Sequence, residues 1–297
     1  MTAPPLYRDF ISAEAIDAEY KPSLRVADAE ARMRSYGERS ADARSRLAGV
    51  YDIPYGPTLD EKLDIFPAAR PDAPVFVFIH GGYWRAFSAK EHSFVALGPV
   101  ALGITTVVVD YSLCPKVTID EITRQCRAAL AWTLRHIGAH GGDPKRVAVG
   151  GHSAGGHLSA MCLETRWEED YGLARDPLAA ALLVSGIYDI EPLRHSYLQP
   201  TIQLDDGIVG RNSPLFAVRP CATPALLTWG AEESAEFARQ STAFHAAWQG
   251  AGNRSEVLAQ PGANHFSAID GFAEPKHPLC RWLAAGLQRQ PGRVTSP

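Results

Sequence analysis

Short apolar runs alternate along this chain with segments of helical periodicity. The runs Val75–Ile79 (VFVFI) and Thr105–Asp110 (TTVVVD) are typical of strands that are covered on both faces of a sheet. Between residues 119 and 137, apolar side chains recur at spacings of three and four, which predicts one helix face, with Gly138 at the position after its end. This alternation predicts a mostly parallel central sheet with helices on both faces.

The same pattern sets the expected order of the remaining elements. Two further buried strands are predicted at Ala179–Ser185 and Ala225–Trp229. Other strands are predicted at Arg146–Gly150 and Glu256–Ala259, after an antiparallel opening pair at Val50–Tyr55 and Lys62–Phe66. Helices are predicted at Gly156–Glu164, around residues 237–248 and around residues 279–287. We expect one domain over residues 1–297, in which the helical residues 1–50 and an excursion at 191–220 cover the ligand site as a small cap.

Composition removes several classes of function. The 29 Lys and Arg residues face 33 Asp and Glu residues, so the net charge is −4, and no basic cluster favours nucleic acid or an anionic membrane surface as a partner. No apolar stretch approaches the roughly 18 residues that a membrane span needs. Met1–Phe10 has no apolar segment typical of a signal peptide, so the expected location is the cytoplasm.

Cysteine and histidine spacing gives no sign of a metal. The five cysteines are widely spaced without a C-x-x-C pair, which favours reduced, mostly buried thiols. His136 and His140 stand four apart, but Gly138 between them argues against a helical metal site. We therefore expect no metal and no organic cofactor, a small-molecule substrate as the ligand, and a homodimer as a possible assembly.

The strongest chemical signal is Gly151–Gly155 (GHSAG), between a predicted strand and a predicted helix. A serine flanked by small residues at such a sharp turn projects its hydroxyl out of the sheet. The N–H groups that begin the next helix point toward any negative charge that develops there. Ser153 is therefore the candidate nucleophile, and an idle serine in a glycine-rich turn is the alternative.

A serine nucleophile needs a base and an acid that orients the base. His265 follows the last predicted strand directly, which no other histidine downstream of Ser153 does, so His265 is the candidate base. Glu232 and Glu233 follow the preceding strand, and only one of two neighbouring side chains in extended structure can face the histidine. We prefer Glu233 as the acid, with Glu232 left open.

The segment His80–Trp84 (HGGYW) follows the predicted strand Val75–Ile79 and fits an oxyanion hole. Its glycines let the backbone approach a reacting carbonyl closely and turn N–H groups inward. The candidate donors are the N–H groups in Gly81–Tyr83, chiefly those of Gly82 and Tyr83, together with that of Ala154. The aromatic residues near these motifs are candidates for an aryl pocket: Tyr83, Trp84, Tyr188 and Phe266. Arg85 is a candidate partner for a substrate carboxylate.

Together these motifs resemble the hormone-sensitive-lipase-like branch of the α/β hydrolases, and within it the kynurenine formamidase (arylformamidase) group. The resemblance rests on six segments: His80–Trp84, Asp110–Thr118 (DYSLCPKVT), Gly151–Leu158 (GHSAGGHL), Ser185–Leu193 (SGIYDIEPL), Glu236–Ser241 (EFARQS) and Asn264–Phe266 (NHF). It implies an α/β-hydrolase fold with Ser153, Glu233 and His265 as the catalytic triad. Glutamate stands at 233 where many members of the group have aspartate.

The resemblance also implies an activity. The expected reaction is hydrolysis of an N-formyl arylamine, with N-formyl-L-kynurenine giving L-kynurenine and formate. A carboxylesterase or thioesterase that acts on small acyl esters would use the same triad, because ester and anilide pass through similar oxyanions. A third interpretation is a non-catalytic ligand-binding member of the fold, although such proteins usually lose the serine or the histidine, and this chain keeps both.

Overall fold

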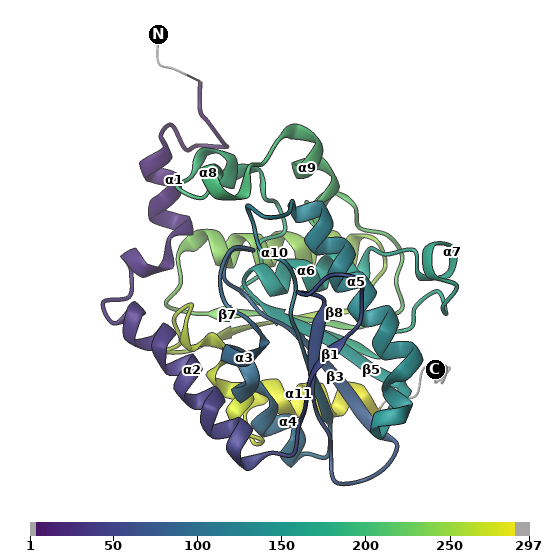
Figure 1. The fold of residues 1–297 in the computed structure, drawn as a ribbon. Coiled ribbons are helices and arrows are strands. Elements are labelled where there is room, and N and C mark those ends of the chain that lie inside the picture. Colours follow the sequence, from purple (N-terminus) through teal and green to yellow (C-terminus); the bar gives the residue numbers. More distant parts are fainter. Residues whose placement is uncertain (1–3, 289–297) are drawn as a thin grey trace.

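The computed structural model describes residues 4–288, and its centre is an eight-stranded sheet (Figure 1). The strands follow the order β1-β2-β4-β3-β5-β6-β7-β8 across the sheet. Strand β2 pairs antiparallel with both β1 and β4, and every other pair is parallel. The strands are β1 (Val50–Pro54), β2 (Lys62–Phe66), β3 (Ala73–Ile79), β4 (Thr105–Val109), β5 (Gly142–His152), β6 (Ala180–Val184), β7 (Ala225–Gly230) and β8 (Ser255–Gln260).

Helices and short 3-10 turns fill the connections between the strands. The α-helices are α1 (Ala13–Tyr20), α2 (Ala29–Arg46), α3 (Ala89–His92), α4 (Leu97–Ala101), α5 (Ile119–His136), α6 (Ala154–Leu163), α7 (Trp167–Tyr171), α8 (Gln199–Ile202), α9 (Asp206–Arg211), α10 (Ala235–Gly250) and α11 (Pro278–Gln288). The 3-10 turns are η1 (Pro22–Leu24), η2 (Ser93–Ala96), η3 (Ile137–His140), η4 (Glu191–His195), η5 (Pro214–Phe216) and η6 (Ser267–Ala273).

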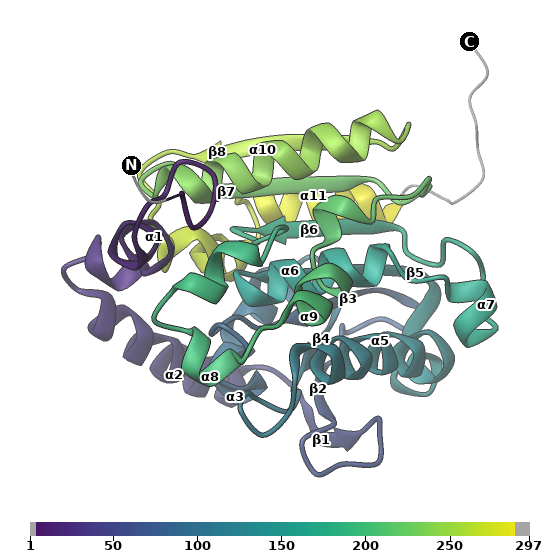
Figure 2. The ribbon, with the colours of Figure 1, turned by 90° about the horizontal axis from the view of Figure 1, so that it is seen from above.

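The sheet separates two hydrophobic clusters, because successive strand residues point to opposite faces. Along β3, Val75, Val77 and Ile79 belong to the cluster that includes residues of α1, α5, α6 and α10. Phe76 and Phe78 belong to the other cluster, with residues of α2 and α11. Figure 1 shows α6 and α10 above the sheet and α11 below it, and Figure 2 shows α10, α6 and α5 in order across the sheet. The predicted mostly parallel sheet with helices on both faces is confirmed.

Two predicted boundaries need correction. Strand β5 begins at Gly142, four residues before the predicted start, because Gly142 pairs with Ala73 of β3 ahead of a register shift. Helix α5 ends at His136 and continues as η3, so Gly138 is not the residue that ends the helix. Gly141 follows η3 with φ 78°, the left-handed conformation that glycine adopts without a steric cost.

No helix within residues 4–288 combines the length and the apolar character that crossing a lipid bilayer requires. The five cysteines all lie in this described part of the chain and form no disulfide, and four of them are buried.

Candidate active site

Ser153 stands at a sharp turn between β5 and α6, with φ 56° and ψ −118°. Its backbone N–H donates to the carbonyl of Val184 at 2.8 Å, which ties the turn to the end of β6. Small neighbours are required here: a Cβ at Gly155 would lie 1.9 Å from the carbonyl oxygen of Ile79. Close packing of the turn against β3 therefore fixes the serine at the carboxyl end of the sheet.

His265 follows β8 and faces Glu233, which follows β7. The distance from His265 Nδ1 to Glu233 Oε2 is 2.6 Å, and the carboxylate side chain is 1% exposed. In the neutral ring, the nitrogen that faces a carboxylate carries the proton, so Nε2 is the nitrogen that can accept one. Glu232, the alternative acid, is exposed. The structure thus brings Glu233, and not Glu232, against the histidine.

The other oxygen of Glu233 is also held. Oε1 accepts a hydrogen bond from Ser185 Oγ at 2.5 Å and another from the Gly230 backbone N–H at 2.7 Å. Ser185 directly follows β6 and has φ 50°. Ser185 was not predicted as a site residue, although its position at the carboxyl end of a predicted strand could have indicated it. Two donors on one oxygen fix the orientation of the carboxylate toward His265.

Buried His152 holds the loop that carries His265. Its Nε2 donates to the backbone carbonyl of His265 at 2.8 Å. Burial lowers the pKa of His152 well below its usual value, and the neighbouring His265 ring adds to this effect. His152 is therefore a neutral donor that holds the backbone of the His265 loop.

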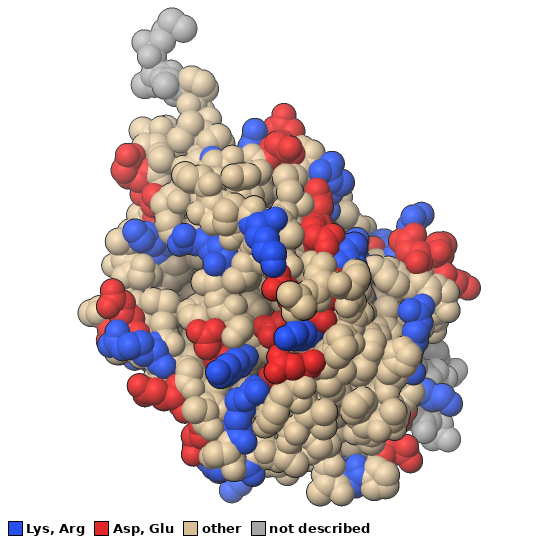
Figure 3. Space-filling model, in the orientation of Figure 1, with Lys and Arg blue, Asp and Glu red and all other residues tan. Residues whose placement is uncertain are grey.

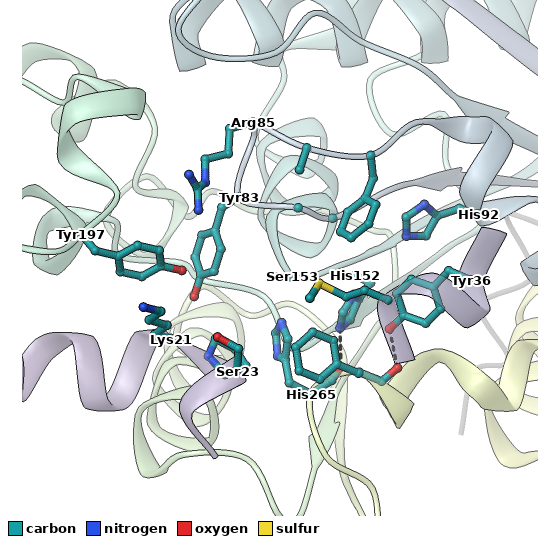
Figure 4. A pocket seen from close by; sticks show the side chains of 17 residues that line it. Lys21, Ser23, Tyr36, Tyr83, Arg85, His92, His152, Ser153, Tyr197 and His265 are labelled. Atoms are coloured by element: carbon teal, nitrogen blue, oxygen red, sulfur yellow. Dashed lines mark hydrogen bonds between the residues drawn. The ribbon is translucent and has the colours of Figure 1, made fainter. Parts of the chain in front are cut away.

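Ser153 and His265 line one cavity of about 430 Å³, within the size range of small-molecule sites. Figure 4 shows the two residues close to each other in the middle of the cavity lining. The N-terminal segment and the excursion after β6 also contribute to its walls. The wall also contains residues that were not predicted from sequence as site residues: Lys21, Pro22, Ser23, Met33, Tyr36, Ala86, Phe87, His92, His152 and Tyr197.

The glycine segment after β3 forms the wall of this cavity beside Ser153. Gly81, Gly82 and Tyr83 all line it, and Gly82 has φ 104°, a conformation that favours glycine. Within residues 4–288, the backbone N–H groups of Gly82 and Tyr83 donate to no protein acceptor. Ala154 is the first residue of α6, so its N–H lacks an acceptor within the helix. These N–H groups fit the requirements of an anion site.

Two of the aromatic residues proposed for an aryl pocket are not in the cavity wall, which corrects that expectation. The Trp84 side chain is fully buried, and its indole N–H donates to His157 Nδ1 at 3.3 Å. Tyr188 is fully buried and stacks on Phe244 with ring centroids 4.5 Å apart. Both pack in the core under the site. Tyr83 and Phe266 do line the cavity, as expected, and so does Arg85.

Comparison with known proteins shows the family of this chain. The chain belongs to the alpha/beta hydrolase fold family, whose model matches residues 76–268. It is therefore an α/β hydrolase, and the predicted fold class is confirmed.

The resemblance to kynurenine formamidases is confirmed as well. The chain is 29% identical to the kynurenine formamidase of Danio rerio, over 92% of this chain and 96% of that protein. It is 28% identical to esterase LipQ of Mycobacterium tuberculosis, over 75% of this chain and 58% of that protein. Among solved structures, a proposed thioesterase from a Silicibacter species superposes with a TM-score of 0.80 at 25% identity, covering 91% of this chain and 97% of that one.

Proposed function

We propose that this protein is a serine hydrolase in which Ser153 is the nucleophile, His265 the general base and Glu233 the acid that orients the base. The observation that carries the proposal is the 2.6 Å contact between His265 and Glu233 beside a strained serine on the same cavity. A base held by a buried carboxylate, next to a serine at a strand-to-helix turn, is the arrangement that activates a hydroxyl.

The proposed reaction begins when His265 Nε2 takes the Ser153 proton as the hydroxyl oxygen attacks the acyl carbon. The tetrahedral oxyanion accepts hydrogen bonds from the N–H groups of Gly82, Tyr83 and Ala154, and each such donor contributes about 3 kcal/mol to the transition state. His265 then donates its proton to the leaving nitrogen or oxygen. Water, activated by the same histidine, releases the acid from the acyl-enzyme and restores Ser153.

For the substrate we propose an N-formyl arylamine, with N-formyl-L-kynurenine yielding formate and L-kynurenine. Support comes from two kynurenine formamidase relatives, which align with 92% and 83% of this chain. Aromatic side chains in the cavity wall, Tyr36, Tyr83, Phe87 and Phe266, suit an aryl group. An aniline is also a better leaving group than an alkyl amine, so a triad of this type suffices for the amide.

A carboxylesterase or thioesterase acting on small acyl esters is the second candidate. It is supported by the similarity to esterase LipQ and to the proposed thioesterase from Silicibacter. The triad serves either reaction, so the distinction depends on the leaving group.

The test compares kcat/KM for N-formyl-L-kynurenine with kcat/KM for 4-nitrophenyl acetate, using purified protein and a Ser153→Ala control. We expect the formamide to be the better substrate and both activities to vanish in the control. A strong preference for the ester would replace the formamidase by the esterase. Turnover that persists in Ser153→Ala would overturn the nucleophile assignment itself.

A further inference from the structure

The charges in the wall of the active-site cavity are all of one sign. Of the 17 residues that line it, Lys21 and Arg85 are cationic and none is Asp or Glu. The chain as a whole has a net charge of −4, so this balance is not a consequence of composition. Figure 3 shows Lys and Arg side chains beside the hollow on this face, with Asp and Glu side chains also near its rim. A cavity with low-dielectric walls and only positive side chains attracts anions.

The two cations are held against one aromatic ring. Lys21 Nζ lies 5.0 Å from the ring centroid of Tyr197, and Arg85 Cζ lies 5.5 Å from the same centroid. Contacts of this kind orient a cation without neutralising it. Figure 4 shows Arg85, Tyr197 and Lys21 at one end of the cavity, Tyr36 and His92 at the other end, and Ser153 and His265 between them.

Neither cation has a carboxylate partner. Across residues 4–288, no ion pair joins Lys21 or Arg85 to Asp or Glu. Asp17, which contacts this segment, accepts the backbone N–H of Tyr197 at 2.9 Å. By contrast, Arg219, which lies outside the cavity, has a carboxylate partner in Asp176 at 4.0 Å. Arg85 also lines an adjoining cavity that contains Asp52, Asp60 and Asp110, but none of these carboxylates forms an ion pair with it, so both cations remain available to a ligand.

We propose that Lys21 and Arg85 form a carboxylate subsite, and that the substrate is an acyl arylamine or aryl ester that carries a carboxylate remote from the bond that is cleaved. The proposal rests on the proposed serine-hydrolase function and deepens it. A guanidinium offers two parallel N–H donors to a carboxylate, and an ammonium adds a point charge. Binding of the carboxylate at this end holds the aryl group between the subsite and Ser153.

The subsite recognises negative charge alone. An α-amino acid substrate also carries an ammonium group, but the cavity wall offers that group no carboxylate. Removal of the ammonium from the substrate is therefore expected to leave KM unchanged or to lower it. Neutralisation of the carboxylate is expected to raise KM.

The experiment uses two matched pairs of substrates. The first pair is N-formyl-L-kynurenine and its α-carboxamide, which differ only in the negative charge, and the desamino acid tests the ammonium. The second pair is 3-(4-acetoxyphenyl)propanoate, an aryl ester that carries a carboxylate on its aryl group, and the corresponding neutral carboxamide. The variants are Lys21→Met, Arg85→Met and the double variant, because methionine keeps an apolar stem against Tyr197. Lys145→Met, at the opposite end of β5 from Ser153, is the control.

Loss of a hydrogen bond to a charged group lowers binding by about tenfold or more. We expect each variant to lower the ratio of kcat/KM for the anionic substrate over its neutral partner by about tenfold, through KM, and Lys145→Met to leave the ratio unchanged. An equal loss on both members of each pair would overturn the subsite. If formamides are not cleaved but the ester pair shows the expected ratio, the formamidase proposal fails while the subsite stands.

Discussion

Replacement of Glu233 by glutamine should remove most of the activity without unfolding the protein. In the wild type, Glu233 Oε1 accepts from Ser185 Oγ and from the Gly230 N–H, while Oε2 faces His265 Nδ1 at 2.6 Å. Glutamine has only one acceptor oxygen, and we expect this oxygen to occupy the place of Oε1, where it faces both donors. The NH2 group must then face His265, so Nδ1 becomes an acceptor and the proton moves to Nε2. A protonated Nε2 cannot accept the proton of Ser153.

The magnitude follows from the loss of the base. An exchange of acid for amide in a serine-protease triad, with geometry intact, lowers kcat on the order of 10⁴-fold, or about 5 kcal/mol of transition-state stabilisation. We expect a loss of that order in kcat for Glu233→Gln. KM should change little, because Glu233 does not line the cavity.

The assay is steady-state hydrolysis of 4-nitrophenyl acetate at pH 8, with thermal unfolding followed by circular dichroism. Glu232→Gln, a change to the exposed neighbour, is the matched control and should stay within about twofold of wild type. A loss of less than about tenfold in Glu233→Gln would refute the assignment. So would the finding that Glu232→Gln is the variant that loses activity.

Three further predictions concern the core that supports the site. Burial lowers the pKa of His157 to about 4, so the stability that depends on its neutral form is fully present above pH 6.5 and is lost as the pH falls toward 4. Over that range, calorimetry should show the free energy of unfolding of the wild type falling by about 3 kcal/mol relative to that of His157→Gln. The same pH dependence of stability in both proteins would contradict this. Gly155→Ala should lower the free energy of unfolding in urea by at least about 3 kcal/mol, because its Cβ would clash with the Ile79 carbonyl. Gly138→Ala, whose Cβ would have no heavy atom within 4 Å, should change that free energy by no more than about 1 kcal/mol. Equal effects of the two substitutions would refute the packing argument. Tyr188→Phe should leave KM unchanged, because Tyr188 does not line the cavity, and a severalfold rise in KM would return it to the substrate site.

The strands and the loops that carry the chemistry could be predicted from sequence because both are local signals. A parallel strand that is buried on both faces reads as an apolar run, and β2 and β4 lie within one residue of their predicted ends. Parallel strands bring their carboxyl ends to one edge of the sheet. Ser153 and His265 could therefore be placed on one cavity, although 111 residues separate them in the chain.

The choice between Glu232 and Glu233 could not be made from sequence, because it depends on the geometry of a turn. The Glu233 N–H donates to the Gly230 carbonyl at 3.0 Å, and the Glu233 carboxylate returns to accept the Gly230 N–H. This reciprocal pair points residue 233 inward and leaves residue 232 in solvent. Neither residue type nor spacing separates two adjacent glutamates, since both fit a helix start.

The walls of the cavity were harder to predict than its chemistry, because they depend on packing between distant segments. Neighbouring Tyr83 and Trp84 both carry positive φ angles, yet the first lines the cavity and the second is buried beneath it. The Tyr36 hydroxyl donates to the Phe266 carbonyl at 2.5 Å, which fixes α2 against the His265 loop across 230 residues of chain. Lys21 enters the cavity through the same N-terminal segment. In the proposed function, strand ends set the triad and a separate segment sets the specificity. We therefore expect relatives that keep the loops but differ before residue 50 to share the reaction and differ in substrate.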